Sequence, residues 1–182
     1  MMHRTAAELE AGLADVRAAP RDEGALRLIV RRTGPGTREI LEMGQLDRTV
    51  GLVGDDWVQR PSRRTGVPDP LAQLTVMNAR YTELIAGQGG PHVWALAGDQ
   101  LYVDLDLSEE NLPGGARLAI GGAVIEIQAK PHTGCAQFSA RFGAEALRIA
   151  NSEMGRALRL RGANATVVEA GVVRLGDLAH KL

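Results

Sequence analysis

Short apolar segments that alternate with turn residues run through most of this 182-residue chain, and they restrict its fold more than any other feature. In several of them apolar and polar residues alternate, as in Leu101–Asp106, which is typical of a half-buried strand. There are about seven to nine such segments. Strands that are joined by a short turn pair with each other in antiparallel orientation. Because closure removes unpaired edges, we predict a mainly β chain, an antiparallel β-barrel with peripheral helices.

Three hairpins are expected from turn residues between consecutive segments. In the first strand Leu26, Leu28 and Val30 should share one face. The Gly121-Gly122 pair is a two-residue hairpin signal. The three pairs are Ala25–Arg32 with Arg38–Leu46, Arg117–Ile120 with Ala123–Lys130, and Ala165–Val168 with Val172–Leu175.

Helical patterns lie at the start of the chain, in its middle and near its end. Thr5 and Glu8 form a capping box before a helix over Ala6–Ala18. Asn78 is a suitable N-cap for a helix that ends at Ile85. Two further helices are expected near the C-terminus, one over residues 138–149 and a shorter one over Glu153–Leu160.

Composition excludes several classes of protein. Basic and acidic residues number 21 and 22, so no overall charge favours nucleic acid or a membrane surface. One cysteine excludes an internal disulfide and a multi-cysteine zinc site. No apolar run approaches the length of a membrane span, and the N-terminal segment is not a signal peptide. We therefore expect a cytoplasmic protein that binds neither nucleic acid nor membrane.

The segment Ile125–Cys135 contains the one cysteine of the chain, at the exit of a predicted strand. Pro131 should end that strand, and Gly134 supplies a turn. Cations near a thiol favour the thiolate, the form that attacks and binds metals, and Lys130 and His132 are close in sequence. Cys135 is thus a candidate nucleophile or metal ligand. The alternative is a buried, inert cysteine.

Arginines follow Cys135 on the predicted helices, including Arg141 and Arg148. Guanidinium groups bind phosphate and other anions, although arginines on amphipathic helices often form only a solvated face. The histidines are scattered, and His132 with Cys135 gives two ligands where structural zinc requires four, so no zinc site is expected. A hydrolase that uses Cys135 and His132 is a further alternative.

The C-terminal half resembles the MOSC domain, the C-terminal domain of molybdenum cofactor sulfurase. The similarity is carried by Asn111–Gly122, by the strand and loop up to Cys135, and by Arg161–Asp177 with its final Gly-Asp pair. Segments at Gly51–Asp55 and Gln73–Met77 also fit. The family often has proline directly before the cysteine, whereas this chain has Gly134.

The resemblance implies a β-barrel domain over residues 25–182, preceded by a helical appendage over residues 1–24. It also implies that Cys135 lies at a pocket and either binds the metal of molybdenum cofactor or carries sulfur as a persulfide. Lys130 and His132 would assist the thiol. The cofactor would be held by residues of the resembling segment and the following helix, namely Asn111, Arg117, Arg141 and Arg148.

The resemblance further suggests which partners this protein would need. Some family members take part in molybdenum-dependent reduction of N-hydroxylated compounds, and others in metal-sulfur transfer. The pyridoxal-phosphate sulfurase domain of larger relatives is absent, so a small stand-alone member would need a sulfur donor of the cysteine desulfurase type or an electron-transfer reductase. The rival hypothesis is a non-catalytic module that binds a small anion or a partner protein in the same pocket.

Overall fold

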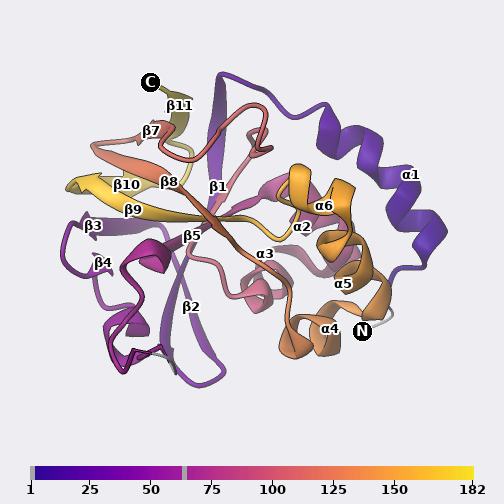
Figure 1. Cartoon of the computed structure of the whole chain (residues 1–182), viewed down its shortest axis with the longest axis horizontal. Helices are drawn as coiled ribbons and strands as arrows, with labels where there is room; N and C mark the ends of the chain where they lie inside the picture. Colours follow the sequence, from indigo (N-terminus) through magenta and orange to yellow (C-terminus); the bar gives the residue numbers. More distant parts are fainter. Residues whose placement is uncertain (1–2, 63–64) are drawn as a thin grey trace.

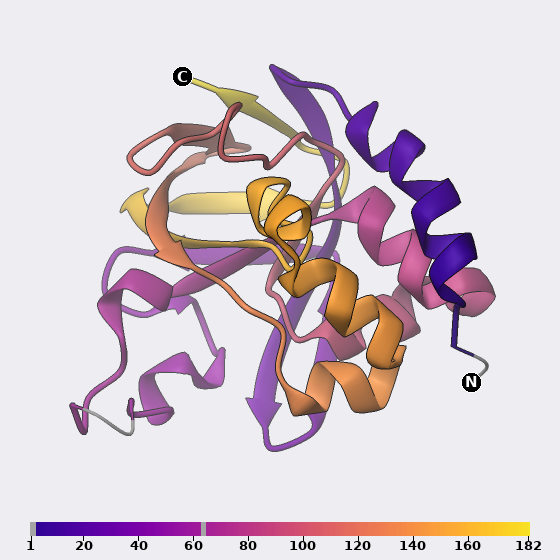
Figure 2. The ribbon, with the colours of Figure 1, turned by 45° about the vertical axis from the view of Figure 1, so that its right-hand side comes forward.

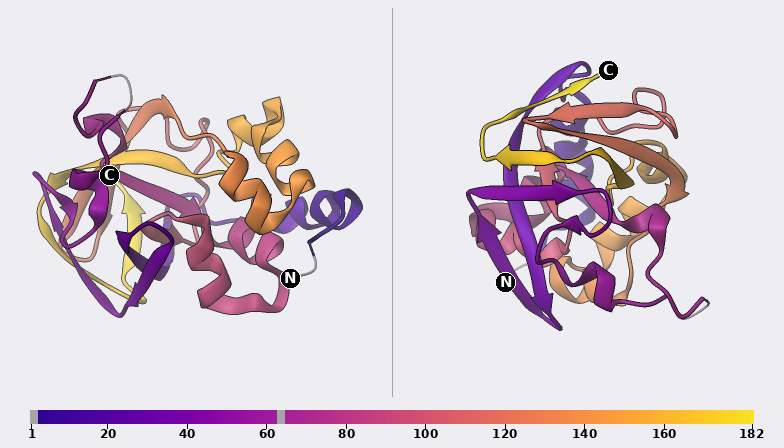
Figure 3. Two further views of the ribbon diagram at one scale, coloured as in Figure 1. Left: turned by 90° about the horizontal axis from the view of Figure 1, so that it is seen from below. Right: turned by 90° about the vertical axis from the view of Figure 1, so that its left-hand side faces the viewer.

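A computed structural model describes residues 3–62 and 65–182, and it separates strands from helices (Figure 1). The strands lie on one side and most helices on the other (Figure 3). The strands are β1 (Glu23–Gly34), β2 (Thr37–Leu41), β3 (Met43–Asp47), β4 (Gly51–Leu52), β5 (Leu74–Asn78), β6 (Leu101–Val103), β7 (Arg117–Ile120), β8 (Ala123–Pro131), β9 (Ala163–Glu169), β10 (Gly171–Arg174) and β11 (Leu178–Lys181). The helices are α1 (Ala6–Arg17), α2 (Ala79–Ala86), α3 (Gly90–Trp94), α4 (Ala136–Phe142), α5 (Ala144–Asn151) and α6 (Glu153–Ala157), with 3-10 turns η1 (Asp56–Gln59), η2 (Pro70–Ala72), η3 (Gly87–Gly89) and η4 (Ala95–Ala97).

The main sheet has eight strands in the order β11-β7-β8-β9-β5-β6-β1-β2, and β11 also pairs with β1. Strand β11 is at one end of this order and β1 is next to the other end, so their pairing is of the kind that closure into a barrel requires. A smaller sheet has the order β10-β3-β4. The mainly β architecture with peripheral helices is confirmed. The prediction of purely antiparallel pairing is wrong, because β5 and β6 are parallel and are joined through α2, α3 and η4.

Strand β1 is buried on both faces and separates two apolar cores. Leu26 and Ile29 belong to the core enclosed by the strands, whereas Leu28 and Val30 belong to the core between sheet and helices. The pairing of β1 with β6 shifts register between Leu26 and Leu28, which is the mark of a bulge. The expectation that Leu26, Leu28 and Val30 share one face is therefore wrong.

The first helix begins as the sequence predicts. Thr5 accepts a hydrogen bond from the Glu8 backbone, and the Glu8 side chain accepts one from the Thr5 backbone. Leu9, Leu13 and Val16 are buried in the core between sheet and helices. The division into an appendage of residues 1–24 and a domain of residues 25–182 stays a prediction.

The C-terminal strands do not form the predicted hairpin. Strand β9 pairs with β5 and β8, while β10 pairs with β3, and β11 then pairs with β7 and β1. The start of β10 lies against the β7–β8 turn, where a Cβ on Gly171 would come within 2.0 Å of the Gly122 carbonyl oxygen. Glycine therefore allows the chain to cross between the two sheets at this point.

Helical structure after Cys135 is divided into α4, α5 and α6, not into two helices. Gly143, with φ of 95°, ends α4 and precedes α5, while the Ser152 side chain caps α6. A residue with positive φ interrupts the helical hydrogen-bond series, which apolar periodicity alone does not reveal. No helix in the described ranges 3–62 and 65–182 is long and apolar enough to cross a membrane.

Candidate functional site

Figure 2 shows the chain passing from the strands into the helical layer after β8. Cys135 lies on this passage, between β8 and α4. Strand β8 ends at Pro131, and Cys135 occupies the N-cap position of α4 in an extended conformation. Its side chain is exposed and makes no capping hydrogen bond. The sequence placed this cysteine correctly at a strand exit, and the alternative of a buried cysteine is wrong.

Lys130 and His132 have partners other than the thiol. The Lys130 ammonium group pairs with the Asp69 carboxylate, which lies just before η2. His132 directly follows the strand, and its Nε2 lies 3.3 Å from Oδ1 of Asp99. Among the described residues, no direct contact of Lys130 or His132 with the Cys135 thiol therefore supports the expected assistance.

Asp99 is the centre of a buried ionic group that the sequence did not reveal. Its carboxylate is fully buried and lies 2.6 Å from Nη1 of Arg161, in addition to its approach to His132. Burial alone would raise the pKa of Asp99, but Arg161 and His132 outweigh it and hold that pKa below its usual value. Burial and the Arg161 charge lower the pKa of His132, although Asp99 opposes them, so His132 is neutral at neutral pH.

This ionic group is connected directly to the helix that Cys135 begins. The Arg161 guanidinium lies over the Phe138 ring in the first turn of α4, 4.9 Å from the ring centroid. Arg161 also donates to the Ala97 carbonyl. The group thus joins three segments beside the first turn of α4. They are the end of β8, the segment before β6 and the segment before β9. The only sequence signal for Asp99 was its place in a Gly-Asp turn before a strand.

A second charged group contains four arginines from separate elements. They are Arg32 of β1, Arg38 of β2, Arg60 after η1 and Arg141 of α4, and we refer to them as the arginine group. Asp55 and Asp56 pair with Arg32 and Arg60, at 2.6 and 2.7 Å. These carboxylates compensate only part of the positive charge.

Arg38 has no carboxylate partner among the described residues. It donates from Nη1 to the Thr37 carbonyl, and its Nε is buried without a hydrogen-bond partner. Burial, followed by the charges of Arg141, Arg60 and Arg32, lowers the pKa of Arg38. A buried guanidinium donor without an acceptor, beside further cations, is suited to an anion.

Arg141 is the one predicted cofactor-binding residue that the structure brings to the arginine group. It donates to the Leu96 carbonyl at 2.6 Å, beside the segment that also contacts Arg38. Arg141 is six positions after Cys135, which corresponds to roughly 9 Å along the axis of α4. The thiol and one member of the arginine group, Arg141, therefore lie at opposite ends of one helix.

The other three predicted cofactor-binding residues have structural partners. Arg148 pairs with Glu145 and Glu10 on the exposed surface of α5 and α1. Arg117 pairs with Glu126 across β7 and β8. The Asn111 amide donates to the Arg21 and Asp106 carbonyls and accepts from Lys181. None of these contacts involves Cys135, Asp99 or the arginine group.

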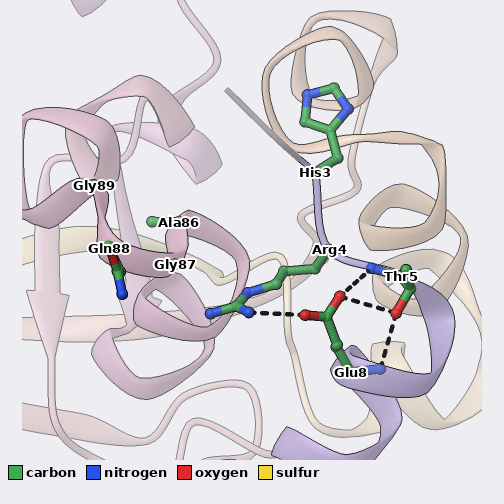
Figure 4. A pocket seen from close by; sticks show the side chains of 8 residues that line it. All are labelled: His3, Arg4, Thr5, Glu8, Ala86, Gly87, Gln88 and Gly89. Carbon is green, nitrogen blue, oxygen red and sulfur yellow. Dashed lines mark hydrogen bonds and ion pairs between the residues drawn. The ribbon is translucent and has the colours of Figure 1, made fainter.

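Two cavities lie near these elements. One, of about 730 Å³, lies between the start of α1 and the end of α2 (Figure 4). There Glu8 accepts from both Arg4 and Thr5, so the charges of its wall are already paired. The other, of about 70 Å³, is lined by Arg156, Arg159, Arg161 and His132. The described residues contain no group of three or more His, Cys, Asp or Glu placed to hold a metal ion.

The chain matches no protein-family model and no curated protein in sequence. Its fold is similar to that of the YuaD protein from Bacillus subtilis, with a TM-score of 0.66, 15% identity, and coverage of 88% of this chain and 97% of that chain. It is also similar to YiiM from Escherichia coli, with a TM-score of 0.54, 19% identity, and coverage of 87% and 69%. For YiiM from Geobacillus stearothermophilus the values are 0.57, 13%, 87% and 75%. YuaD and YiiM are proteins of the MOSC type, so the comparisons support a MOSC-like fold for this chain.

Proposed function

We propose that this chain is a small MOSC-type protein that binds molybdenum cofactor, with Cys135 as the ligand of the metal. The observation that carries the proposal is that an exposed, uncapped thiol begins the helix that also contains Arg141, a member of the arginine group in which Arg38 has no acidic partner among the described residues. The barrel expected for this family is part of the proposal, and the β11–β1 pairing supports it.

The residues present fit such a cofactor chemically. A soft thiolate suits a metal such as molybdenum, and guanidinium groups suit the phosphate of a pterin. The buried Nε of Arg38 is a donor that a phosphate oxygen would satisfy. Cys135 would therefore hold the metal, while Arg38 and Arg141 would hold the phosphate. When bound, the cofactor supplies a redox-active metal for reduction of a substrate such as an N-hydroxylated compound.

The protein itself contributes binding and orientation. The Asp99 carboxylate lies 3.3 Å from the His132 ring, and the lowered pKa of His132 keeps the ring neutral at neutral pH. Asp99 also holds Arg161 against the first turn of α4. These contacts would fix the loop between Pro131 and Cys135, and a fixed loop holds a ligand residue in one position.

Reduction requires electrons, and sulfur transfer requires a source of sulfur. An electron-transfer reductase, or a sulfur donor of the cysteine desulfurase type, is therefore part of the proposal, and both would be met in the cytoplasm. Carriage of sulfur on Cys135 as a persulfide is the second candidate, because the thiol is exposed and a donor could reach it.

The test is analysis of metal and pterin in protein purified without oxygen from a host that makes the cofactor. Wild type should contain molybdenum and pterin in about equal amounts, whereas Cys135→Ser should lack the metal. Arg38→Gln should lose much of the pterin, and Arg148→Gln, which removes the same charge from exposed α5, should retain it. Absence of molybdenum and pterin from the wild type would overturn the cofactor proposal.

The same samples distinguish the second candidate and the rival class. An intact mass that is one sulfur atom heavier, in wild type but not in Cys135→Ser, would favour a persulfide carrier. If neither metal nor extra sulfur is found, a non-catalytic binding module becomes the better account.

A further inference from the structure

We infer that the 70 Å³ cavity between β8, α6 and the start of β9 is a site for a free tetrahedral oxyanion such as phosphate or sulfate. We call it the oxyanion cavity. Its charged and titratable lining consists of Glu109, His132, Arg156, Arg159 and Arg161. Cys135 is not in its wall, and the inference does not depend on the proposed function.

The charges at the oxyanion cavity do not balance. Three arginines line the cavity, against Glu109 in the wall and Asp99, which pairs with Arg161, while His132 is neutral at neutral pH. The Arg159 guanidinium also donates to the Leu107 and Leu112 carbonyls. Burial lowers the pKa of Arg159, and the opposing charge of Glu109 offsets this only in part. One positive charge is left over, and an anion would neutralise it.

The wall also contains a buried donor without an acceptor. Arg161 is only 7% exposed; its Nη1 and Nη2 bind Asp99 and Ala97, and its Nε is buried without a hydrogen-bond partner. Such an N–H group costs free energy unless water or a ligand accepts its proton. An oxyanion offers acceptors that no wall residue supplies to this nitrogen.

The end of α6 places two of the lining arginines together. Arg159 has φ of 46°, and it is the one non-glycine residue with positive φ in the described ranges. This left-handed residue ends the helix, since the Leu160 N–H donates to the Gly155 carbonyl. The turn places Arg159 and Arg161 in one wall, on either side of Leu160.

The volume decides the class of anion. A water molecule occupies about 30 Å³ in the liquid, so this cavity can hold about two waters or one small oxyanion. Sites for nucleotides and drug-sized ligands are usually above about 300 Å³. A whole pterin or nucleotide is therefore too large for this cavity.

The experiment is calorimetric titration of the wild-type protein with inorganic phosphate and with sulfate at low ionic strength. Saturable binding with a stoichiometry near one is expected. Arg156→Gln, at an exposed lining residue, should weaken binding by about tenfold or more, because a charge-assisted hydrogen bond is lost. Glu109→Gln should strengthen binding, because it removes the negative charge from the wall.

Matched controls separate this site from general attraction and from the thiol site. Arg27→Gln removes one exposed arginine from β1, outside the cavity wall, and should leave binding unchanged. Cys135→Ser should also bind normally, so failure of the proposed function would not affect the result. Phenyl phosphate should bind far more weakly than inorganic phosphate. Equal effects of Arg27→Gln and Arg156→Gln, equal binding of phenyl phosphate, or no saturable binding by wild type would overturn the inference.

Discussion

Nε2 of His132 lies 3.3 Å from Oδ1 of Asp99, a carboxylate that is completely buried and also bound by Arg161. A single acidic residue before β6 thereby holds together the end of β8 and the start of β9. Because Arg161 contacts Phe138 in the helix that Cys135 begins, this carboxylate is connected to the candidate site.

Asp99→Asn should destabilise the protein by about 3–5 kcal/mol, because it leaves the buried Arg161 charge without its partner. Urea unfolding followed by circular dichroism measures this change. The control is Asp69→Asn, which breaks the exposed pair with Lys130 and should cost no more than about 1 kcal/mol. Similar losses for the two variants would contradict a central structural role for Asp99.

Stability should fall as the pH is lowered through the ordinary range of histidine. The folded protein holds the pKa of His132 below the usual value of 6.5, so between these two values the unfolded chain binds more protons than the folded chain. The free energy of unfolding is then highest above pH 6.5 and decreases toward the folded pKa. His132→Gln should reduce this slope, whereas His180→Gln, at an exposed position, should not. Unfolding curves at several pH values measure it.

The Cys135 thiol should react with iodoacetamide in the folded protein nearly as fast as in the unfolded chain, because it is exposed. Intact mass against time measures the rate. Cys135→Ser should change the free energy of unfolding by no more than about 0.5 kcal/mol, as for most exposed substitutions. Strong protection of the thiol in the folded state would contradict an exposed position for Cys135 at the start of α4.

Gly171→Ala should destabilise the protein by about 3 kcal/mol, since its Cβ would meet the Gly122 carbonyl oxygen at 2.0 Å. Gly176→Ala is the matched comparison, because that glycine has φ of 87° but open space around its Cβ. It should cost only the backbone strain, about 1 kcal/mol. Thermal unfolding of both variants measures the difference, and a larger loss at Gly176 would be the contrary outcome.

Features set by neighbours in the chain could be predicted from the sequence. Thr5 and Glu8 begin α1, Asn78 caps α2, and Gly121 allows the turn between β7 and β8. Cys135 likewise follows the end of a strand as expected. Each of these depends on backbone preferences and hydrogen bonds over a few residues, which the local sequence determines.

Partners distant in the chain were decided only by the tertiary structure. Strand β10 joins β3 and not β9, β5 lies parallel to β6, and Lys130 pairs with Asp69. Arg38 became a candidate site residue only because the fold brings Arg141 and two other arginines near it. The physical reason is that many segments offer equivalent apolar edges and charges, and only the packing of the whole chain selects which of them meet.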